Sequence, residues 1–300
     1  MPYAFILNPS ANRKRAKDAE LWLRSHVESF WPGSEIFVTT SKADISRAVN
    51  EAISRFDTVI ACGGDGTVNE VFSRSVELIQ AQQLLTLGVL PMGSGNDFAK
   101  SVGLSTDPRV AIHQLREALP TPIDYVSYST NLGSGFMFNT MNIGLGGQIN
   151  FEASKVQWLK GPLIYIYAAL KSLMHVVPVD VDLELGEINT NERMVMISIA
   201  NGAVEGGNFK VAPQATNRDG YLDIITVRPL PAWRLLPLLP LFLFAKQMWY
   251  KSVTHRRTTK LKLSCNTPLP LHVDGEQCGL EVSFLDVTLH EKGIMVLSRN

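Results

Sequence analysis

The stretch DTVIACGGDGTVNEV, residues 57–71, decides the fold. An apolar run, TVIAC, is followed by three glycines around one carboxylate, and a helical spacing of apolar residues begins at Val68. A strand that ends in a glycine loop before a helix is typical of an open α/β sheet, which binds ligands at the carboxyl ends of its strands. The loop is therefore either a tight turn or a cradle for phosphate.

The same order of strand, loop and helix recurs through residues 1–126. TVIAC and LLTLGVLP are almost continuously apolar, as strands covered on both faces are. Alternation of this kind implies parallel strands joined by crossover helices, so we predict an α/β three-layer domain. We expect strands at 3–7, 35–39, 58–62 and 85–90, and helices at 16–30, 44–55 and 68–79.

The pattern changes in residues 127–290. One apolar helix is expected near 163–176, and many short strands follow, separated by turn signals such as RDG, DGE and EKG. This pattern predicts an antiparallel β-sandwich or barrel. We expect two domains with an active-site cleft between them, and the last strand, within 291–300, returning to the first domain.

Composition narrows the class of protein. The 300 residues hold 28 Lys and Arg against 28 Asp and Glu, so no basic surplus is available to bind nucleic acid by counterion release. The three cysteines are far apart and show no CxxC spacing, which favours a reducing compartment over a disulfide framework or a zinc site. The N-terminus lacks the pattern of a secretory signal, so we expect a cytoplasmic protein.

The glycine loop can be interpreted chemically. Gly63, Gly64 and Gly66 can adopt positive φ and let backbone N–H groups approach an anion, to which the next helix adds a favourable potential. A carboxylate beside phosphates needs a cation between them, so Asp65 predicts Mg²⁺. Thr67 could cap the helix or donate to a phosphate. The alternative is an ordinary glycine turn with an Asx cap.

A second loop, PMGSGNDFAK at 91–100, follows the strand LLTLGVL with the same design. Gly93, Ser94 and Gly95 could form a nest of N–H groups, and Asn96 and Asp97 lead into a helix. The loop NPS at 8–10 follows the first strand. Neither GxxxxGK[ST] nor GxGxxG is present, so the site is not a common nucleotide fingerprint.

Taken in order, these segments resemble the diacylglycerol kinase catalytic superfamily, which includes sphingosine and ceramide kinases and short bacterial lipid kinases. The resemblance runs essentially end to end. It is carried by NPSA at 8–11, GGDGTVNEV at 63–71, PMGSGNDFA at 91–99, the segment of Asp124, NIGLGG at 142–147, GGNFKVAPQATNRDGYLD at 206–223 and VDGE at 273–276.

The resemblance implies two domains, ATP and Mg²⁺ as cofactors, and transfer of the γ-phosphoryl group to a lipid hydroxyl. It implies that Asp65, Asp97 and Asp124 organise the catalytic Mg²⁺, and that Glu276 is the proton acceptor. A second, structural metal maps to Asp219 and the carbonyls of Thr216 and Tyr221. The nucleotide-binding positions are Asn8, Pro9, Ser10, Thr39, Gly63, Gly64, Asp65, Gly66, Thr67, Val68, Asn69, Glu70, Gly93, Ser94, Gly95 and Asn96.

Two positions depart from the commonest pattern of the superfamily. The first loop has no glycine after Ser10, and Gln148 stands where an acidic residue is frequent. Lys14, Arg15 and Lys155 are candidate phosphate-facing cations, with a solvated surface role as the default. On its own, DGE predicts a hairpin turn, and that turn could itself direct Glu276 toward the cleft.

The apolar run LLPLLPLFLFA at 235–245 is too short to span a bilayer, and its two prolines disfavour a straight helix. It is either core or a membrane-interface segment, since Trp249 and Tyr250 lie beside lysines. We therefore expect a lipid substrate at the membrane surface and peripheral association with the inner membrane face. A homodimer remains open, as do two other functions: an NAD kinase, or a non-catalytic protein that binds lipid or nucleotide.

Overall fold

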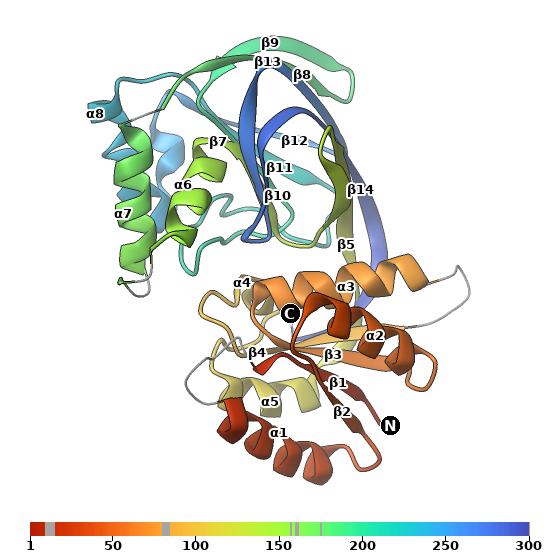
Figure 1. The fold of residues 1–300 in the computed structure, drawn as a ribbon. Helices are drawn as coiled ribbons and strands as arrows, with labels where there is room; N and C mark the ends of the chain where they lie inside the picture. Colours follow the sequence, from red (N-terminus) through yellow and green to blue (C-terminus); the bar gives the residue numbers. More distant parts are fainter. Residues whose placement is uncertain (10–15, 80–84, 157, 160–161, 175, 300) are drawn as a thin grey trace. The chain divides into compact units, whose positions relative to one another are not determined.

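The computed structural model describes residues 1–9, 16–79, 85–156, 158–159, 162–174 and 176–299. The chain forms two compact units, one made of Met1–Ile123 with Lys292–Asn300 and the other of Asp124–Glu291. The last strand, β14 (Glu276–Ser298), starts in the second unit and ends in the first (Figure 1).

The first unit is a parallel sheet between two layers of helices. Its strand order is β2-β1-β3-β4, with the end of β14 beside β4. Helices α2 and α3 cover one face, and α1 and α5 cover the other (Figure 1). This confirms the predicted α/β three-layer class. The elements are β1 (Ala4–Leu7), α1 (Ala16–Phe30), β2 (Glu35–Val38), α2 (Lys42–Ile53), β3 (Thr58–Gly63), α3 (Asp65–Leu78), β4 (Thr86–Pro91), α4 (Asp97–Ser101) and α5 (Pro108–Glu117).

Local sequence explains these elements. Strands β1, β3 and β4 are buried along nearly their whole length, as their continuous apolar runs predict. Helix α2 starts at Ser41, whose hydroxyl accepts the Asp44 N–H at 3.1 Å. Helix α5 starts with Asp107 as N-cap and Pro108 in its first turn.

The second unit is built on antiparallel strands in the order β12-β11-β10-β7-β13-β14, which confirms the β-sandwich class. In addition, β5 pairs with β14 and β6, and β8 pairs with β13 and β9. The strands are β5 (Leu119–Thr130), β6 (Gly133–Met137), β7 (Thr140–Gly144), β8 (Val179–Leu185), β9 (Ile188–Met194), β10 (Met196–Ala200), β11 (Leu222–Val227), β12 (Val253–Thr258) and β13 (Lys260–Val273).

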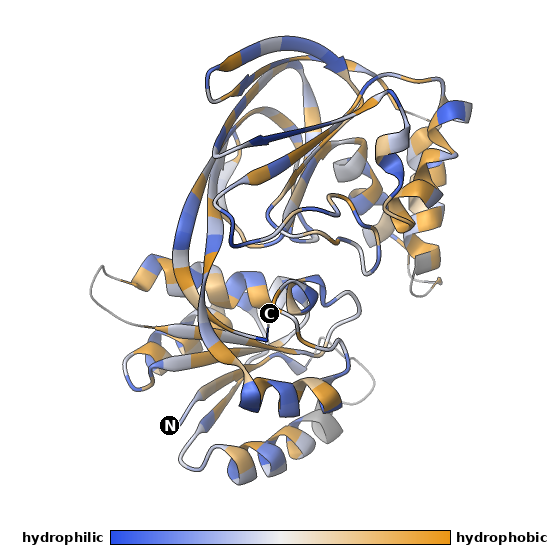
Figure 2. Cartoon of the chain, turned by 180° about the vertical axis from the view of Figure 1, so that it is seen from behind, coloured by the Kyte–Doolittle hydropathy of each residue, from blue (hydrophilic) through white to orange (hydrophobic). Residues whose placement is uncertain are grey.

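Five helical segments lie in the second unit. Helix α7 is largely apolar, and Figure 2 draws it mostly in the hydrophobic colour. Within the described residues, no helix is long and apolar enough to cross a membrane. The segments are α6 (Leu145–Ser154), α7 (Pro162–Leu173), α8 (Ala232–Leu235), α9 (Leu238–Leu243) and the 3-10 turn η2 (Gln247–Trp249).

Several predicted elements need correction. The strands β5, β6, β7, β9 and β12 and the helices α5, α6, α8 and α9 were not expected. The two runs at 260–265 and 269–273 form one strand, β13, which stays continuous through register shifts against β14. Likewise, EKG at 291–293 is not a turn: Lys292 takes a φ of 49° inside β14, so the strand continues through a local irregularity.

Candidate active site

The two glycine loops of the first unit lie against each other. Strands β3 and β4 are parallel neighbours in a register that pairs Gly63 with Pro91, so both loops start at the same edge of the sheet. The N–H of Met92 donates to the carbonyl of Gly63 at 2.8 Å. A Cβ atom on Gly93 would lie 2.5 Å from the Cα of Gly64. The predicted meeting of the two loops is therefore present.

The reason for the glycines differs from the prediction. Gly63, Gly64, Gly66, Gly93 and Gly95 all lack the positive φ that we expected for the first loop. What excludes a side chain is close approach: a Cβ on Gly63 would lie 2.5 Å from the Thr67 hydroxyl. The left-handed residue is Asn96, with a φ of 53° and a carboxamide that bonds back to both backbone groups of Gly93 at 2.9 and 3.0 Å.

This packing makes Gly93→Ala a testable change. We expect it to lower the free energy of unfolding by about 1–3 kcal/mol, because backbone at Gly64 cannot move aside as a flexible side chain could. Urea unfolding followed by circular dichroism measures the effect. The exposed neighbour Ser94 supplies the control, Ser94→Ala, for which a change within about 0.5 kcal/mol is expected. Equal stability of the two variants would show that the loop contact is looser than the structure has it.

Asp65 begins helix α3, three residues earlier than predicted. The helix N-cap is Gly64, so Thr67 lies inside the first turn and is not the cap. One oxygen of Asp65 accepts the N–H of Phe98 at 3.1 Å, which ties the first loop to helix α4. A Cβ on Gly95 would lie 2.8 Å from the other Asp65 oxygen and 3.5 Å from an oxygen of Asp97. The two carboxylates therefore flank the same glycine.

Some of the oxygen atoms of these two carboxylates are suited to bind a hard cation such as Mg²⁺. Mg²⁺ prefers carboxylate oxygens and keeps several waters, so one or two protein ligands are enough. One oxygen of Asp65 faces Gly95, and Asp97 forms an ion pair with Lys100 at 2.7 Å. Among the described residues, no three acidic, histidine or cysteine side chains gather as a metal site. Asp65 is accordingly the residue that fits Mg²⁺ best.

The other residues that we expect to bind the nucleotide differ in their burial and in their hydrogen bonds. Asn8 donates to the Thr67 hydroxyl at 3.0 Å, and the buried Thr39 hydroxyl donates to the carbonyl of Leu7 at 3.0 Å. The side chain of Val68 is buried in the core, and its N–H donates to the carbonyl of Gly64 at 3.0 Å, so neither group faces a ligand directly.

Three further positions complete this side of the site. The side chain of Glu70 pairs with Lys42 at 3.4 Å, and Asn69 accepts from Ser73 at 3.4 Å. Pro9 is partly exposed after the first strand. Ser10, Lys14 and Arg15 lie outside the described residues.

In the second unit, Glu276 follows a two-residue hairpin turn between β13 and β14. Asp274 and Gly275 have φ values of 48° and 85°, and Val273 pairs with Glu276 across the turn. Positive φ at both central residues is the type I′ geometry that Asp-Gly favours. The DGE motif is thus a turn, and the turn leaves the Glu276 side chain exposed.

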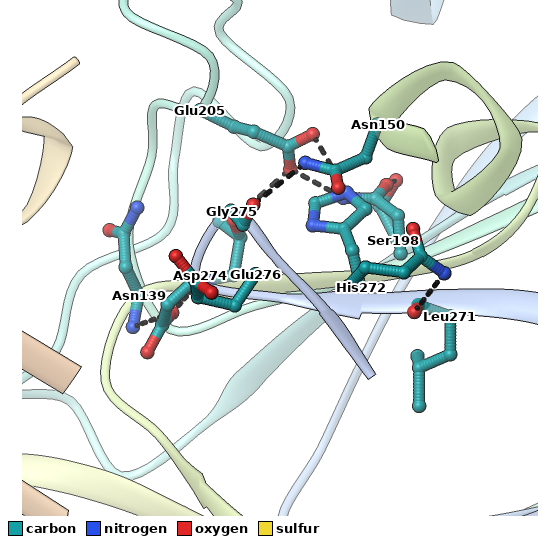
Figure 3. Close-up of polar contacts among 12 residues, drawn as sticks. Asn139, Asn150, Ser198, Glu205, Leu271, His272, Asp274, Gly275 and Glu276 are labelled. Carbon is teal, nitrogen blue, oxygen red and sulfur yellow. Dashed lines mark hydrogen bonds and ion pairs between the residues drawn. The ribbon is translucent and has the colours of Figure 1, made fainter. Parts of the chain in front are cut away.

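The turn is held rigidly by residues that the prediction did not assign (Figure 3). The Asp274 carboxylate accepts three backbone N–H groups, those of Phe138, Asn139 and Thr140, at 2.9 to 3.0 Å. Asn150 of α6 donates to the carbonyl of Gly275 at 2.9 Å. Asp274 stands in the quoted VDGE, but its partners are more than 130 residues away, so no local pattern could reveal its role.

Asp124 and Asp219 hold a loop of the second unit in place. The fully buried Asp124 accepts the N–H of Gly220 at 2.9 Å. Asp219 accepts the N–H of Tyr221 at 3.2 Å and forms an ion pair with Arg257, whose guanidinium also lies 4.5 Å from the Tyr221 ring centre. The carboxylate expected to bind a structural metal thus already faces a cation. That metal role, shared with the carbonyl of the exposed Thr216, stays a prediction.

An apolar pocket of about 720 Å³, a volume that includes open solvent, lies within the second unit beside the β13–β14 hairpin. Helices α6, α7, α8 and α9 supply most of its walls. Asn142 lines it, and Asn142 pairs in register with His272, two residues before Asp274. The pocket is lined by Asn142, Leu145, Gly146, Ile149, Tyr165, Ala169, Leu173, Met196, Ser198, Glu205, Gly206, Phe209, Val211, Val227, Leu235, Leu238, Leu239 and Phe242.

One charged group lines this pocket. Glu205 accepts from the Thr140 hydroxyl at 3.0 Å and from the Asn142 amide, and lies 3.3 Å from Nε2 of the buried His272. Burial alone would raise the pKa of Glu205, but His272 and the two donated hydrogen bonds outweigh it and hold this pKa below its ordinary value. Neither residue was assigned a role from the sequence, although Glu205 directly precedes the quoted GGNFK segment.

Comparison with known proteins assigns the family. The diacylglycerol kinase catalytic domain matches residues 2–128, and the YegS C-terminal NAD kinase beta sandwich-like domain matches residues 139–287. A Chromohalobacter salexigens protein named "Probable lipid kinase YegS-like" is 32% identical over 236 residues, which cover 78% of this chain and 73% of that protein. The chain belongs to the diacylglycerol kinase catalytic family. It is therefore a lipid kinase by family.

Other members of this family match over more of the chain. The diacylglycerol kinase of Bacillus subtilis is 27% identical over 92% of this chain and 89% of its own. The crystal structure of a diacylglycerol kinase from Bacillus anthracis shares the fold with a TM-score of 0.77 at 18% identity, over 99% of this chain and 97% of that one. Yeast NADH kinase is a more distant fold neighbour, with a TM-score of 0.52 at 13% identity, over 100% of this chain and 84% of that one.

Proposed function

We propose that this kinase transfers the γ-phosphoryl group of ATP, with Mg²⁺, to a hydroxyl of a membrane lipid, either diacylglycerol or a related glycerolipid. The apolar pocket beside the Glu276 hairpin is the observation that carries the proposal. Acyl chains need an apolar cavity, and an apolar pocket with one polar end suits an amphiphile. The relatives named lipid kinase and diacylglycerol kinase support the same substrate class.

The first unit supplies groups suited to the phosphoryl donor. The N-terminus of α3 offers backbone N–H groups and a favourable potential for phosphate. Asp65 would hold Mg²⁺, which when bound neutralises charge that develops on the phosphates. The bond from Phe98 fixes one oxygen of Asp65 and leaves the other toward Gly95.

Glu276 is suited to orient the attacking hydroxyl and take its proton. Phosphoryl transfer through a loose transition state requires positioning more than a strong base, so an exposed carboxylate on a rigid turn is adequate. The three N–H groups on Asp274 and the Asn150 bond to Gly275 keep the turn from adjusting. Asp274 and Asn150 act here as positioning residues for Glu276.

The outer surface of the helices around the pocket favours a lipid membrane. On α7, the exposed apolar residues Leu163, Ile166, Tyr167 and Leu170 follow helical spacing and form a stripe next to the face with Ala169 and Leu173, which line the pocket. Near α8 and α9, exposed aromatic residues occur beside cations, as at membrane interfaces: Trp233 with Arg234, Phe244, and Trp249 with Lys246. We propose that this surface contacts the bilayer, which leaves the lipid a short path to the pocket.

Phe242 and Phe244 form a matched pair that tests the membrane proposal. Phe242 is 7% exposed and lines the pocket, whereas Phe244 is 68% exposed. We expect Phe242→Ala to lower the free energy of unfolding by about 3–5 kcal/mol, since it leaves a cavity. Phe244→Ala should keep stability and weaken sedimentation with anionic vesicles by about tenfold. Vesicle binding by Phe244→Ala at the wild-type level would contradict a membrane role for this surface.

Transfer of label from γ-labelled ATP tests the proposed function itself. With dioleoylglycerol in detergent micelles, we expect label in the organic phase only when protein and Mg²⁺ are both present. NAD is the competing acceptor, because the GGDGT segment is shared with NAD kinases. Label found in NAD and in no lipid would contradict the proposal and would indicate an NAD kinase.

A further inference from the structure

The carboxylate of Glu205 is out of place in a pocket that is otherwise mostly apolar. A charge in such surroundings costs free energy unless it is paired and hydrogen-bonded. The chain retains this charge and supports it with His272, Thr140 and Asn142. The Asn142 side chain is itself held in place, because the Ser198 hydroxyl donates to its carboxamide oxygen.

Glu205 keeps acceptor capacity toward the pocket. An ionised carboxylate offers about four acceptor positions on its two oxygens. One carboxylate oxygen, Oε2, accepts from Thr140 and Asn142, the other, Oε1, lies 3.3 Å from Nε2 of His272, and 22% of the side-chain surface remains accessible. The residue therefore presents a fixed acceptor to whatever enters the pocket. Because the carboxylate has no proton to give, that partner must be a donor.

We propose that Glu205 accepts a hydrogen bond from the backbone of the lipid substrate, so that the preferred lipid carries a hydroxyl or ammonium group in addition to the hydroxyl that is phosphorylated. The inference rests on the proposed function and narrows its substrate class. Glu205 lies in the loop between β10 and β11 and faces His272, which lies two residues before Asp274 on β13, so the acceptor contacts the hairpin that carries Glu276.

The chemistry separates two classes of glycerolipid. In diacylglycerol the single hydroxyl is the reacting group, and the remaining polar atoms are ester oxygens. These oxygens and the Glu205 carboxylate are all hydrogen-bond acceptors, so no hydrogen bond could form between them. A monoacylglycerol keeps a second hydroxyl, and a long-chain amino alcohol adds an ammonium group. Both can donate to Glu205 while their reacting hydroxyl is at Glu276. A site with a buried acceptor discriminates against a ligand that leaves it unpaired.

The competing explanation is structural: Glu205 and His272 could serve only to tie the loop at 205 to strand β13. Glu205→Gln separates the two explanations, because it keeps the size of the side chain and removes the charge that selects a donor. Leu239→Ala is the matched control from the same pocket, since lost apolar packing should weaken all lipids of equal chain length alike. Circular dichroism establishes that both variants are folded.

The test compares oleoyl lipids at equal mole fraction in detergent micelles: monooleoylglycerol, dioleoylglycerol and a C18 amino alcohol. In the wild type we expect kcat/KM for monooleoylglycerol to exceed that for dioleoylglycerol by about tenfold or more. This factor corresponds to the free energy of one hydrogen bond to a charged group. Glu205→Gln should bring this ratio close to one, and Leu239→Ala should preserve it. The amino alcohol arm shows whether a hydroxyl or an ammonium is the better donor.

Three outcomes overturn the inference. These are a wild-type ratio near one, a ratio that Glu205→Gln leaves unchanged, or an equal loss on all lipids in that variant. In each of them lipid phosphorylation itself persists in the wild type, so the proposed function stands. If the wild type phosphorylates no lipid, the proposed function fails, and displacement of a bound fluorescent oleoyl lipid then decides the inference: equal competition by the two glycerolipids would refute it.

Discussion

Glu276→Gln is expected to lower kcat for lipid phosphorylation by about 10²- to 10⁴-fold, the range of a lost general base. The substitution keeps the size of the side chain and leaves the Asp274-Gly275 turn and its hydrogen bonds in place. ATP affinity, measured by equilibrium binding with Mg²⁺, should therefore stay close to that of the wild type. A steady-state assay under saturating ATP separates the change in kcat from any change in KM.

The exposed Glu281 on the same strand provides the control, since Glu281→Gln removes one carboxylate of β14 at a different position. Its turnover should equal that of the wild type. If Glu276→Gln lost nucleotide binding and stability together with turnover, the residue would be a structural part of the hairpin, and the assignment as proton acceptor would be wrong.

Asp65→Asn is expected to reduce turnover by about 10²-fold or more, because transition-state charge on the phosphates would lose its compensating cation. Asparagine retains an oxygen that can accept the Phe98 N–H, so the tie between the two loops survives. The variant should also need higher Mg²⁺ for half-maximal activity. A titration of turnover against Mg²⁺ at fixed ATP measures both effects.

Asp57→Asn serves as the comparison for Asp65, because Asp57 is an exposed carboxylate just before β3. It should leave both the rate and the Mg²⁺ requirement as they are in the wild type. Activity of Asp65→Asn within a few fold of wild type would remove Asp65 from the metal site.

Local patterns predicted the framework of the site well. The apolar runs before each glycine loop placed β3 and β4 correctly, and parallel order alone implied that their loops would meet. The conformation within the loops was predicted for the wrong reason. Either positive φ or close contact can require a glycine, and only the folded structure shows that the reason here is close contact, as between Gly93 and Gly64.

The polar end of the apolar pocket could not be predicted from the sequence. Asn142, Glu205 and His272 are separated by more than 60 residues each, and the β7–β13 pairing together with the loop at 205 brings them together. Glu205 and His272 stand just outside the quoted motifs, and Asn142, the first residue of NIGLGG, was assigned no role of its own. Glu276 differs, because the Asp-Gly pair before it is a local turn signal that the structure confirms.

The segment 235–245 has one buried apolar face and one exposed apolar face. Leu235, Leu238 and Phe242 are buried against the pocket, while Leu236 and Phe244 are exposed. A composition rich in leucine and phenylalanine hides this division, because both faces of the segment are apolar. Burial of one face explains the core character, and the other face is the part that we assign to the membrane.

One measurement tests the central claim most directly. Wild type and Glu276→Gln are incubated side by side with γ-labelled ATP, Mg²⁺ and a total lipid extract, and the products are separated by thin-layer chromatography. We predict one class of labelled phospholipid with the wild type and, at equal ATP binding, almost none with the variant. Equal labelling by both proteins, or label that enters no lipid, would contradict the account.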